Sequence, residues 1–213
     1  MSVPGTPPIL AAGDRGSHAA AVLALEAGGV IGLPTETVYG LGVLPRPASL
    51  QALIDAKRRS RDKGIALLID DIAQAEGLVV VPAAALALAS AFWPGALTLV
   101  LPLAEGAAVP EAVTGGRSTL GIRVPDHAVP RALARALGPL AVSSANRSGE
   151  TDATTAAELV ESVGASLALV LDDGPVRGGV ASTVIAVSRD DGIEILRPGA
   201  LLADDIERVL AGA

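Results

Sequence analysis

Short apolar runs alternate with helical segments along nearly the whole chain, and this alternation limits the fold more than any other sequence feature. Runs such as residues 30–33, 65–69 and 167–171 carry no charge and lie between segments of helical periodicity. A strand that is apolar on both faces has to be covered on both faces. The pattern therefore predicts an α/β fold, with a twisted mixed or mostly parallel sheet and helices on both faces.

The residues also set the bounds of the expected elements. Helices are expected over residues 17–27, 47–57, 82–92, 155–163 and 204–210, and one more, capped by Asp126, between strands at 119–124 and 140–143. Further strands are expected at residues 78–81, 97–101, 183–187 and 193–196. Because proline and glycine are frequent near the N-terminus, we expect residues 1–14 to form an extended arm and residues 15–213 a single domain.

Composition narrows the class of protein. Of the 213 residues, 50% are hydrophobic and none is cysteine, which excludes disulfide frameworks, thiolate metal sites and cysteine nucleophiles. The formal net charge of −7 argues against a general nucleic-acid coat and a basic membrane-surface protein. Residues 77–104 carry no charge, but Pro82, Pro94 and Pro102 interrupt them, so we expect no membrane span. Since the first residues lack a leader pattern, we expect a cytoplasmic protein.

Five short segments carry polar residues next to expected strands. They read LPTETVYGLG at 33–42, KRRSRDKG at 57–64, VSSANRSG at 142–149, ASTV at 181–184 and LRPG at 196–199. In open α/β sheets ligands bind beside strand ends, so these segments are candidate binding loops. Each also has a plainer interpretation, as an ordinary turn, a helix cap or an exposed run of charge.

The segment at 57–64 has the strongest local chemistry of the five. It holds five of the 16 basic residues, both lysines among them, and only one acid. A concentrated positive spot on an acidic protein indicates a local anion site rather than a long nucleic-acid groove. Arginine and lysine side chains in this segment are suited to clamp a triphosphate.

Several standard sites are absent from the sequence. There is no GxxxxGK[ST] loop, no GxGxxG after a strand and no HExxH motif. His127 beside Asp126, with a serine, has the composition of a hydrolytic triad, but no G-x-S-x-G elbow supports it. His18 and His127 are expected on the surface at helix starts. The acidic pairs at 70–71 and 172–173 are expected to serve in caps and turns rather than as metal ligands.

Taken in order, the motifs carry far more information than any one of them. They run LPTETVYGLG, KRRSRDKG, FWPGALTLVL, GIRVPDH, SSANRSG, ASTV and LRPGAL, from about residue 17 to 201. This order resembles the YrdC-like family of threonylcarbamoyl-AMP synthases, in its short single-domain form. The resemblance implies the family's α/β fold and a nucleotidyltransferase that joins L-threonine, bicarbonate and ATP and releases pyrophosphate. It also implies partner proteins that transfer the threonylcarbamoyl group to tRNA.

The resemblance further implies roles for individual residues. Thr35, Thr119, Arg123 and Ser182 would bind threonine, with Arg123 pairing with its carboxylate. Lys57, Arg59, Lys63, Ser144, Asn146 and Arg197 would bind ATP. Lys57, Arg59 and Ser182 would act at the reacting phosphate, and Tyr39, Phe92 and Trp93 would shape the cavity wall. Mg²⁺ on the triphosphate is expected from the chemistry, without assigned protein ligands.

The chain departs from the family pattern at Ser60, Leu68 and Ala186, where a proline, a histidine and an aspartate are usual. Two other functions stay open. The first is an RNA-binding or ribosome-maturation module on the same scaffold, with weak tRNA contact through the basic segment. The second is a carbamoyl-adenylate module that serves another acceptor.

Overall fold

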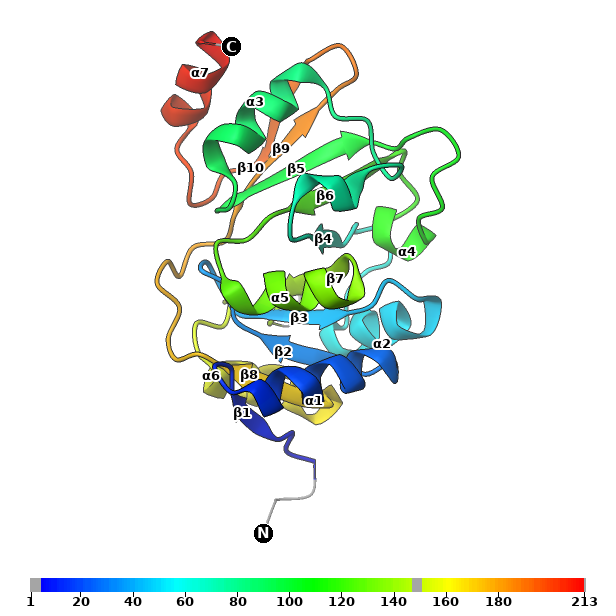
Figure 1. Cartoon of the computed structure of the whole chain (residues 1–213), viewed down its shortest axis with the longest axis vertical. Coiled ribbons are helices and arrows are strands. Elements are labelled where there is room, and N and C mark those ends of the chain that lie inside the picture. The colour runs from blue at the N-terminus through cyan, green and yellow to red at the C-terminus, as the bar shows by residue number, and fades with distance from the viewer. Residues whose placement is uncertain (1–4, 147–150, 213) are drawn as a thin grey trace.

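The molecule is built around one mixed β-sheet. The structure is a computed structural model that describes residues 5–146 and 151–212. Its strands are β1 (Ile9–Ala11), β2 (Ile31–Leu33), β3 (Gly40–Val43), β4 (Ala66–Leu68), β5 (Leu97–Pro102), β6 (Thr119–Arg123), β7 (Leu140–Ser144), β8 (Leu169–Asp172), β9 (Thr183–Val187) and β10 (Ile193–Arg197). They lie in the order β1-β8-β2-β3-β7-β4-β6-β5-β9-β10, from bottom to top in Figure 1. Among the described residues, four neighbouring pairs are parallel (β1–β8, β2–β8, β4–β6, β5–β9) and the other five are antiparallel, which confirms the mixed sheet.

Helices cover both faces of this sheet, as the apolar strands require. They are α1 (Arg15–Glu26), α2 (Pro47–Lys57), α3 (Ala83–Phe92), α4 (Glu111–Thr114), α5 (Ala128–Leu137), α6 (Ala156–Val163) and α7 (Ala203–Ala211), with 3₁₀ turns at Ile72–Ala75 and Gly164–Ser166. Strand β2 shows the two faces. Ile31 and Leu33 join a buried cluster with residues of α1 and α5, while a Cβ on Gly32 would meet Leu159 of α6. Figure 1 shows α1 and α5 in front of the lower strands and α6 behind them.

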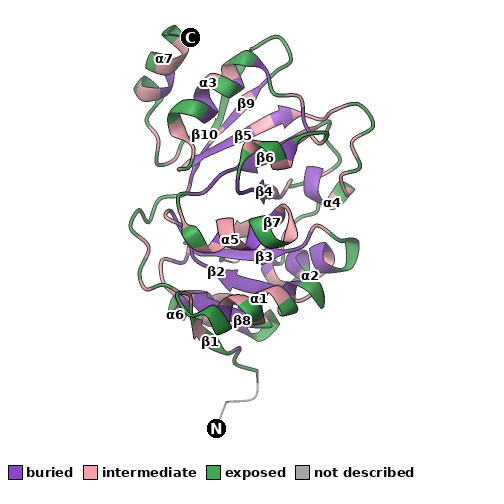
Figure 2. Ribbon diagram, in the orientation of Figure 1, coloured by how far each residue is buried: buried purple, intermediate pink, exposed green. Residues whose placement is uncertain are grey.

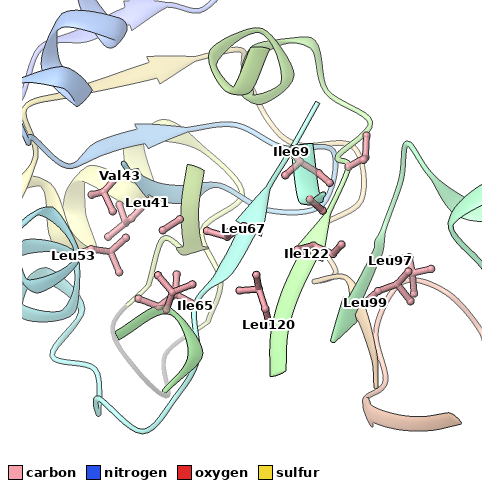
Figure 3. Close-up of a cluster of buried hydrophobic side chains, with 14 of the residues drawn as sticks. Leu41, Val43, Leu53, Ile65, Leu67, Ile69, Leu97, Leu99, Leu120 and Ile122 are labelled. Carbon is pink, nitrogen blue, oxygen red and sulfur yellow. The ribbon is translucent and has the colours of Figure 1, made fainter. Parts of the chain in front are cut away.

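The larger core cluster extends along the upper strands. Figure 3 shows Leu67, Leu97, Leu99, Leu120 and Ile122 gathered in it, and Figure 2 shows that most of the sheet is buried. Because side chains alternate along a strand, the residues between these leucines and isoleucines point to the opposite face. That opposite face is where the sheet is left open for a cavity.

Strand β3 was not expected, because its sequence GLGV contains two glycines and glycine is depleted in strands. The structure explains both glycines. A Cβ on Gly40 would lie 2.8 Å from Val142 Cγ1, and one on Gly42 would lie 2.7 Å from Leu33 Cδ2. The side chains of Val142 and Leu33 therefore fill the space that side chains at these two positions of β3 would occupy.

Two other details differ from the sequence expectations. Residues 78–81 do not form a strand: they make one isolated bridge, Val79 to Leu103, directly before Pro82 and α3. Asp126 does not cap α5; His127 is its N-cap, and its Nδ1 accepts from the Val129 amide at 3.2 Å. Within the expected N-terminal arm, Ile9–Ala11 pairs in parallel with β8. In residues 5–146 and 151–212, no helix has the length and apolar character needed to span a bilayer.

Candidate functional site

A cavity of about 350 Å³ lies against the open face of the upper strands. On β6 it is lined by Thr119, Gly121 and Arg123. The residues between them, Leu120 and Ile122, are buried in the core on the other face (Figure 3). The period-2 pattern of the strand thus places polar and small groups toward the cavity and branched apolar groups away from it.

Every charged residue that lines the cavity, among those the structure describes, is an arginine: Arg59, Arg117, Arg123 and Arg197. Burial, and then the charge of Arg197, lower the pKa of Arg59, so two guanidinium groups act on each other across the cavity. On a protein of net charge −7, this concentration of positive charge indicates an anion-binding site.

Backbone and hydroxyl oxygens hold two of these guanidinium groups. Arg59 donates from Nη2 to the carbonyl of Gly64 at 2.7 Å, and more weakly from Nη1 to Ser143 Oγ at 3.4 Å. Arg197 donates from Nη2 to the carbonyl of Ser182 at 2.7 Å. Neither group has a carboxylate partner in the described part of the chain, so the positive charge of both is available to an anionic ligand.

Arg123 is held by an ion pair instead. Its Nη2 lies 2.7 Å from Glu36 Oε1 and 3.1 Å from Thr37 Oγ1, and its Nε donates to the carbonyl of Gly95 at 3.0 Å. Burial lowers the pKa of Arg123, and the charge of Glu36 opposes that shift. Glu36 and Thr37 belong to the PTET segment at residues 34–37. The sequence analysis predicted a role only for Thr35 in this segment.

Hydroxyl groups complete the lining. Thr35 Oγ1 donates to the carbonyl of Val38 at 2.6 Å, which fixes the turn after β2. Ser182 Oγ lies 2.8 Å from Oγ1 of Thr98, a β5 residue that sequence reasoning did not select. Thr119, Ser143 and Ser144 also line the cavity. Leu68, one of the departures from the family pattern, lies on the floor.

Lys57 has a different place from the one expected. It is buried, does not line the cavity, and donates from Nζ to the carbonyls of Ser144 and Asn146 and to Asn146 Oδ1. Burial, and then the charge of Arg59, lower its pKa from 10.5 to about 8. Lys57 therefore ties the end of α2 to the turn that follows β7.

Two other predicted residues lie outside the lining. Lys63 is exposed, and Asn146 is buried beside Lys57. Residues 147–149 of the VSSANRSG segment lie outside the described residues. The structure thus brings together Thr35, Arg59, Thr119, Arg123, Ser144, Ser182 and Arg197 around one cavity. Their roles toward substrates stay predictions.

The prediction that Tyr39, Phe92 and Trp93 shape the cavity wall is wrong. Tyr39 is fully buried, and its hydroxyl donates to Asp172 Oδ1 at 3.0 Å and to the carbonyl of Gly174 at 2.7 Å. Phe92 and Trp93 pack against the core. All three rings are absent from the lining because the cavity floor consists of strand residues with small or branched side chains.

Both histidines lie at helix starts, as expected, but they are only partly exposed. His127 Nε2 lies 3.3 Å from Asp173 Oδ2, and its side chain is only 15% exposed, because the turn at residues 172–174 covers it. His18 is also partly buried. As expected, Asp71 caps a 3₁₀ turn, while Asp70 pairs with Arg131 and Arg135. Within residues 5–146 and 151–212 there is no group of three or more acidic or histidine side chains that could hold a metal ion.

Comparisons with known proteins agree with this geometry. The Sua5/YciO/YrdC family model, described as telomere recombination, matches residues 23–199. The threonylcarbamoyl-AMP synthase of Bacillus subtilis is 41% identical over 184 residues, which are 85% of this chain and 53% of that protein. The enzyme of the same name from Idiomarina loihiensis is 40% identical over 161 residues, 72% of this chain and 83% of that protein.

A solved structure gives the same result. Pyrococcus abyssi Sua5 complexed with L-threonine matches with a TM-score of 0.88 at 34% identity, over 95% of this chain and 60% of that one. The chain spans about half the length of the Bacillus subtilis relative. Because the family match covers most of the chain and the fold agrees with a solved member, this protein belongs to the Sua5/YciO/YrdC family.

Proposed function

We propose that this protein makes threonylcarbamoyl-AMP and pyrophosphate from L-threonine, bicarbonate and ATP. One observation carries the proposal: a cavity that the described residues line with four arginines and several hydroxyls but no carboxylate, in a chain 41% identical to a threonylcarbamoyl-AMP synthase. Both the threonine carboxylate and the triphosphate are anions. A cavity that holds only positive and neutral groups suits both of them.

We assign the threonine end to Arg123 and the hydroxyls near it. Arg123 is held in place by Glu36, Thr37 and the carbonyl of Gly95, so its geometry is set before substrate arrives. A planar guanidinium pairs well with a carboxylate. Thr35, Thr119 and Ser182 line the same cavity and would contact the amine or hydroxyl of threonine. A solved relative was crystallised with L-threonine, which supports this assignment.

We assign the nucleotide end to Arg59, Arg197 and Ser144, with Lys63 and Asn146 nearby. Arg59 and Arg197 already act on each other electrostatically, so an anion between them would relieve repulsion and gain attraction from both. Lys57 would act as a positioning residue, since its ammonium group holds the turn at residues 144–146. The sequence analysis expected Lys57 to contact the ATP phosphates directly, and the positioning role proposed here replaces that contact.

The chemistry needs no nucleophile from the protein. The amine of threonine and bicarbonate give a carbamate and water. A carbamate oxygen then attacks the α-phosphorus, the bond from that phosphorus to the bridging oxygen breaks, and pyrophosphate leaves with the electron pair. Arg59, Arg197 and Ser182 would neutralise and orient the reacting phosphate. Mg²⁺ would lower the charge of the triphosphate, and since no carboxylate lines the described part of the cavity, the phosphates themselves would supply anionic ligands.

The product would pass to partner proteins that modify tRNA, in the cytoplasm.

The first test is pyrophosphate release from ATP, with L-threonine and bicarbonate omitted in turn. Release that requires both substrates supports the proposal. If a folded protein that binds ATP releases no pyrophosphate, the proposal fails. Salt-dependent retention of RNA would then favour the RNA-binding alternative, and dependence on carbamoyl phosphate would favour another acceptor.

A further inference from the structure

Arg117 lies outside the sequence motifs and has no role in the proposed reaction, although it lines the cavity. It lies in the loop between α4 and β6 and lines the same cavity as Arg59, Arg123 and Arg197. Its side chain is exposed. It therefore sits where the cavity meets solvent, so its charge there is not lost to desolvation.

The loop that carries Arg117 has a fixed path. Gly115 and Gly116 adopt positive φ angles of 64° and 76°, which other residues rarely adopt. A Cβ on Gly115 would lie 2.6 Å from the carbonyl oxygen of Asp62, so this loop packs directly against the basic segment at 57–64. The amide of Ile65 donates to the carbonyl of Val113 at 2.8 Å, which joins the two loops further. Arg117 is thereby brought close enough to Asp62 for its charge to act on that carboxylate.

Arg117 also differs from the other three arginines in its partners. Arg59, Arg123 and Arg197 each donate to oxygens of the protein. Arg117 has no hydrogen bond or ion pair to any residue within 5–146 and 151–212. The nearby acid Asp62 receives a hydrogen bond from Ser60, and that bond, with lesser contributions from the charges of Lys63 and Arg117, lowers its pKa. The whole donor set of Arg117 is thus available to a ligand.

We propose that Arg117 binds the outer phosphates of a polyphosphate, the β and γ groups of ATP and then the leaving pyrophosphate. The identity of the nucleotide rests on the proposed function. We place the outer phosphates at this solvent edge because the exposed guanidinium of Arg117 lines the cavity there. Arginine binds a phosphate group through two parallel hydrogen bonds. Because AMP has neither a β nor a γ phosphate, this contact favours ATP and pyrophosphate over AMP.

The test compares binding of ATP, pyrophosphate and AMP to the full chain by isothermal titration calorimetry. We expect Arg117→Ala to weaken ATP and pyrophosphate binding about tenfold and AMP binding less than twofold, and Arg117→Lys to fall between. The matched control is Arg208→Ala on α7, which removes an equal charge from an exposed arginine outside the cavity and paired with Asp205. We expect it to change no affinity more than twofold.

The outcomes separate the two proposals. If the wild type binds ATP and pyrophosphate and Arg117→Ala binds them equally well, the role of Arg117 is refuted and the proposed function stands. An equal loss for all three ligands also refutes it, because that would be a general charge effect. If the folded wild type binds neither ATP nor pyrophosphate, the proposed function fails, and the inference fails with it. Circular dichroism of each variant checks the fold.

Discussion

Glu36 holds Arg123 from behind the cavity: Glu36 Oε1 lies 2.7 Å from Arg123 Nη2, while the two side chains are only 16% and 7% exposed. Arg123 lines the cavity, and Glu36 does not. The positive charge is therefore presented to the cavity, with its counter-ion on the far side. This arrangement keeps a buried guanidinium charged and oriented while the acid stays out of the way of an anionic substrate.

We predict that Glu36→Gln will lower the free energy of unfolding by about 2 kcal/mol, because a buried charge loses its partner. Under the proposed function, KM for threonine should rise about tenfold, with a smaller change in kcat, because Arg123 is less well positioned. Urea unfolding and substrate titrations measure these effects. Glu207→Gln on the exposed face of α7 is the control. An unchanged unfolding free energy would show that the ion pair contributes nothing.

Lys57 offers a second prediction, because the chain has only two lysines. In protein labelled with ¹³C at lysine Cε, we expect one of two NMR signals to titrate near pH 8. Lys63→Arg leaves that signal in place and so assigns it to Lys57. Failure of any lysine signal to move between pH 7 and about 9 would contradict the lowered pKa.

The same shift has a consequence for stability. The pKa of Lys57 falls from 10.5 in the unfolded chain to about 8 in the folded protein. Between about pH 8 and pH 10.5 the unfolded chain therefore binds more protons than the folded protein does. The contribution of Lys57 to stability should therefore rise with pH from about 8 to 10.5. Lys57→Met should remove this rise. Under the proposed function it should also abolish product formation, since the turn at residues 144–146 loses its anchor.

Tyr39 is the only tyrosine, so its ionisation can be followed alone by ultraviolet absorbance. Burial raises its pKa from 10.0 to about 12, which means that phenolate should be scarce at pH 11 while the protein stays folded. The neutral form is favoured in the fold, so this contribution to stability is complete below pH 10 and is lost as pH rises toward 12.

Tyr39→Phe separates structure from activity. It removes the hydroxyl that bonds Asp172 and Gly174, and we expect a loss of about 1–2 kcal/mol in unfolding free energy. Because Tyr39 does not line the cavity, kcat/KM should change less than twofold. A large loss of kcat/KM in a stable variant would show that the turn at residues 172–174 takes part in the reaction.

Thr98→Val tests whether the Ser182 hydroxyl is oriented by its neighbour. The substitution keeps the shape of the side chain and removes the 2.8 Å contact with Ser182 Oγ. We predict a fall in kcat of about tenfold with a change of about 1 kcal/mol in stability. The control is Thr183→Val, which removes the hydrogen bond to the carbonyl of Leu201 and should reduce stability only. In a double mutant with Ser182→Ala, the two effects on kcat should not add.

Local signals predicted some elements and sites well. Helix α2 lies at residues 47–57 as expected, because Pro47 occupies its first turn and leucines recur on one face. Arg59, Arg123 and Arg197, which come from three separate motifs, all line one cavity, while their roles toward substrates stay predictions. The expected strand at 78–81 was wrong because its apolar run has only one bridging partner, a property that no local pattern records.

The rest depended on contacts between distant parts of the chain. Glu36 and Arg123 are 87 residues apart in sequence, so nothing near either one identifies the other as its partner. Strand β3 forms because two glycines admit neighbouring side chains, although glycine alone argues against a strand. Arg117 follows two glycines in a loop that belongs to none of the sequence motifs. Only the packing of that loop against the segment at 57–64 brings it to the cavity.

The strand order also matters while the chain is being synthesised. The lining runs from Thr35, after β2, to Arg197, at the end of β10, and neighbours in the sheet are often far apart in sequence. A growing chain therefore exposes its arginines one at a time, with no pocket to gather them, until residue 197 has left the ribosome. A ligand of the cavity can stabilise only chains that have reached that point. Under the proposed function, nucleotide would therefore stabilise chains that extend past residue 197 over shorter fragments.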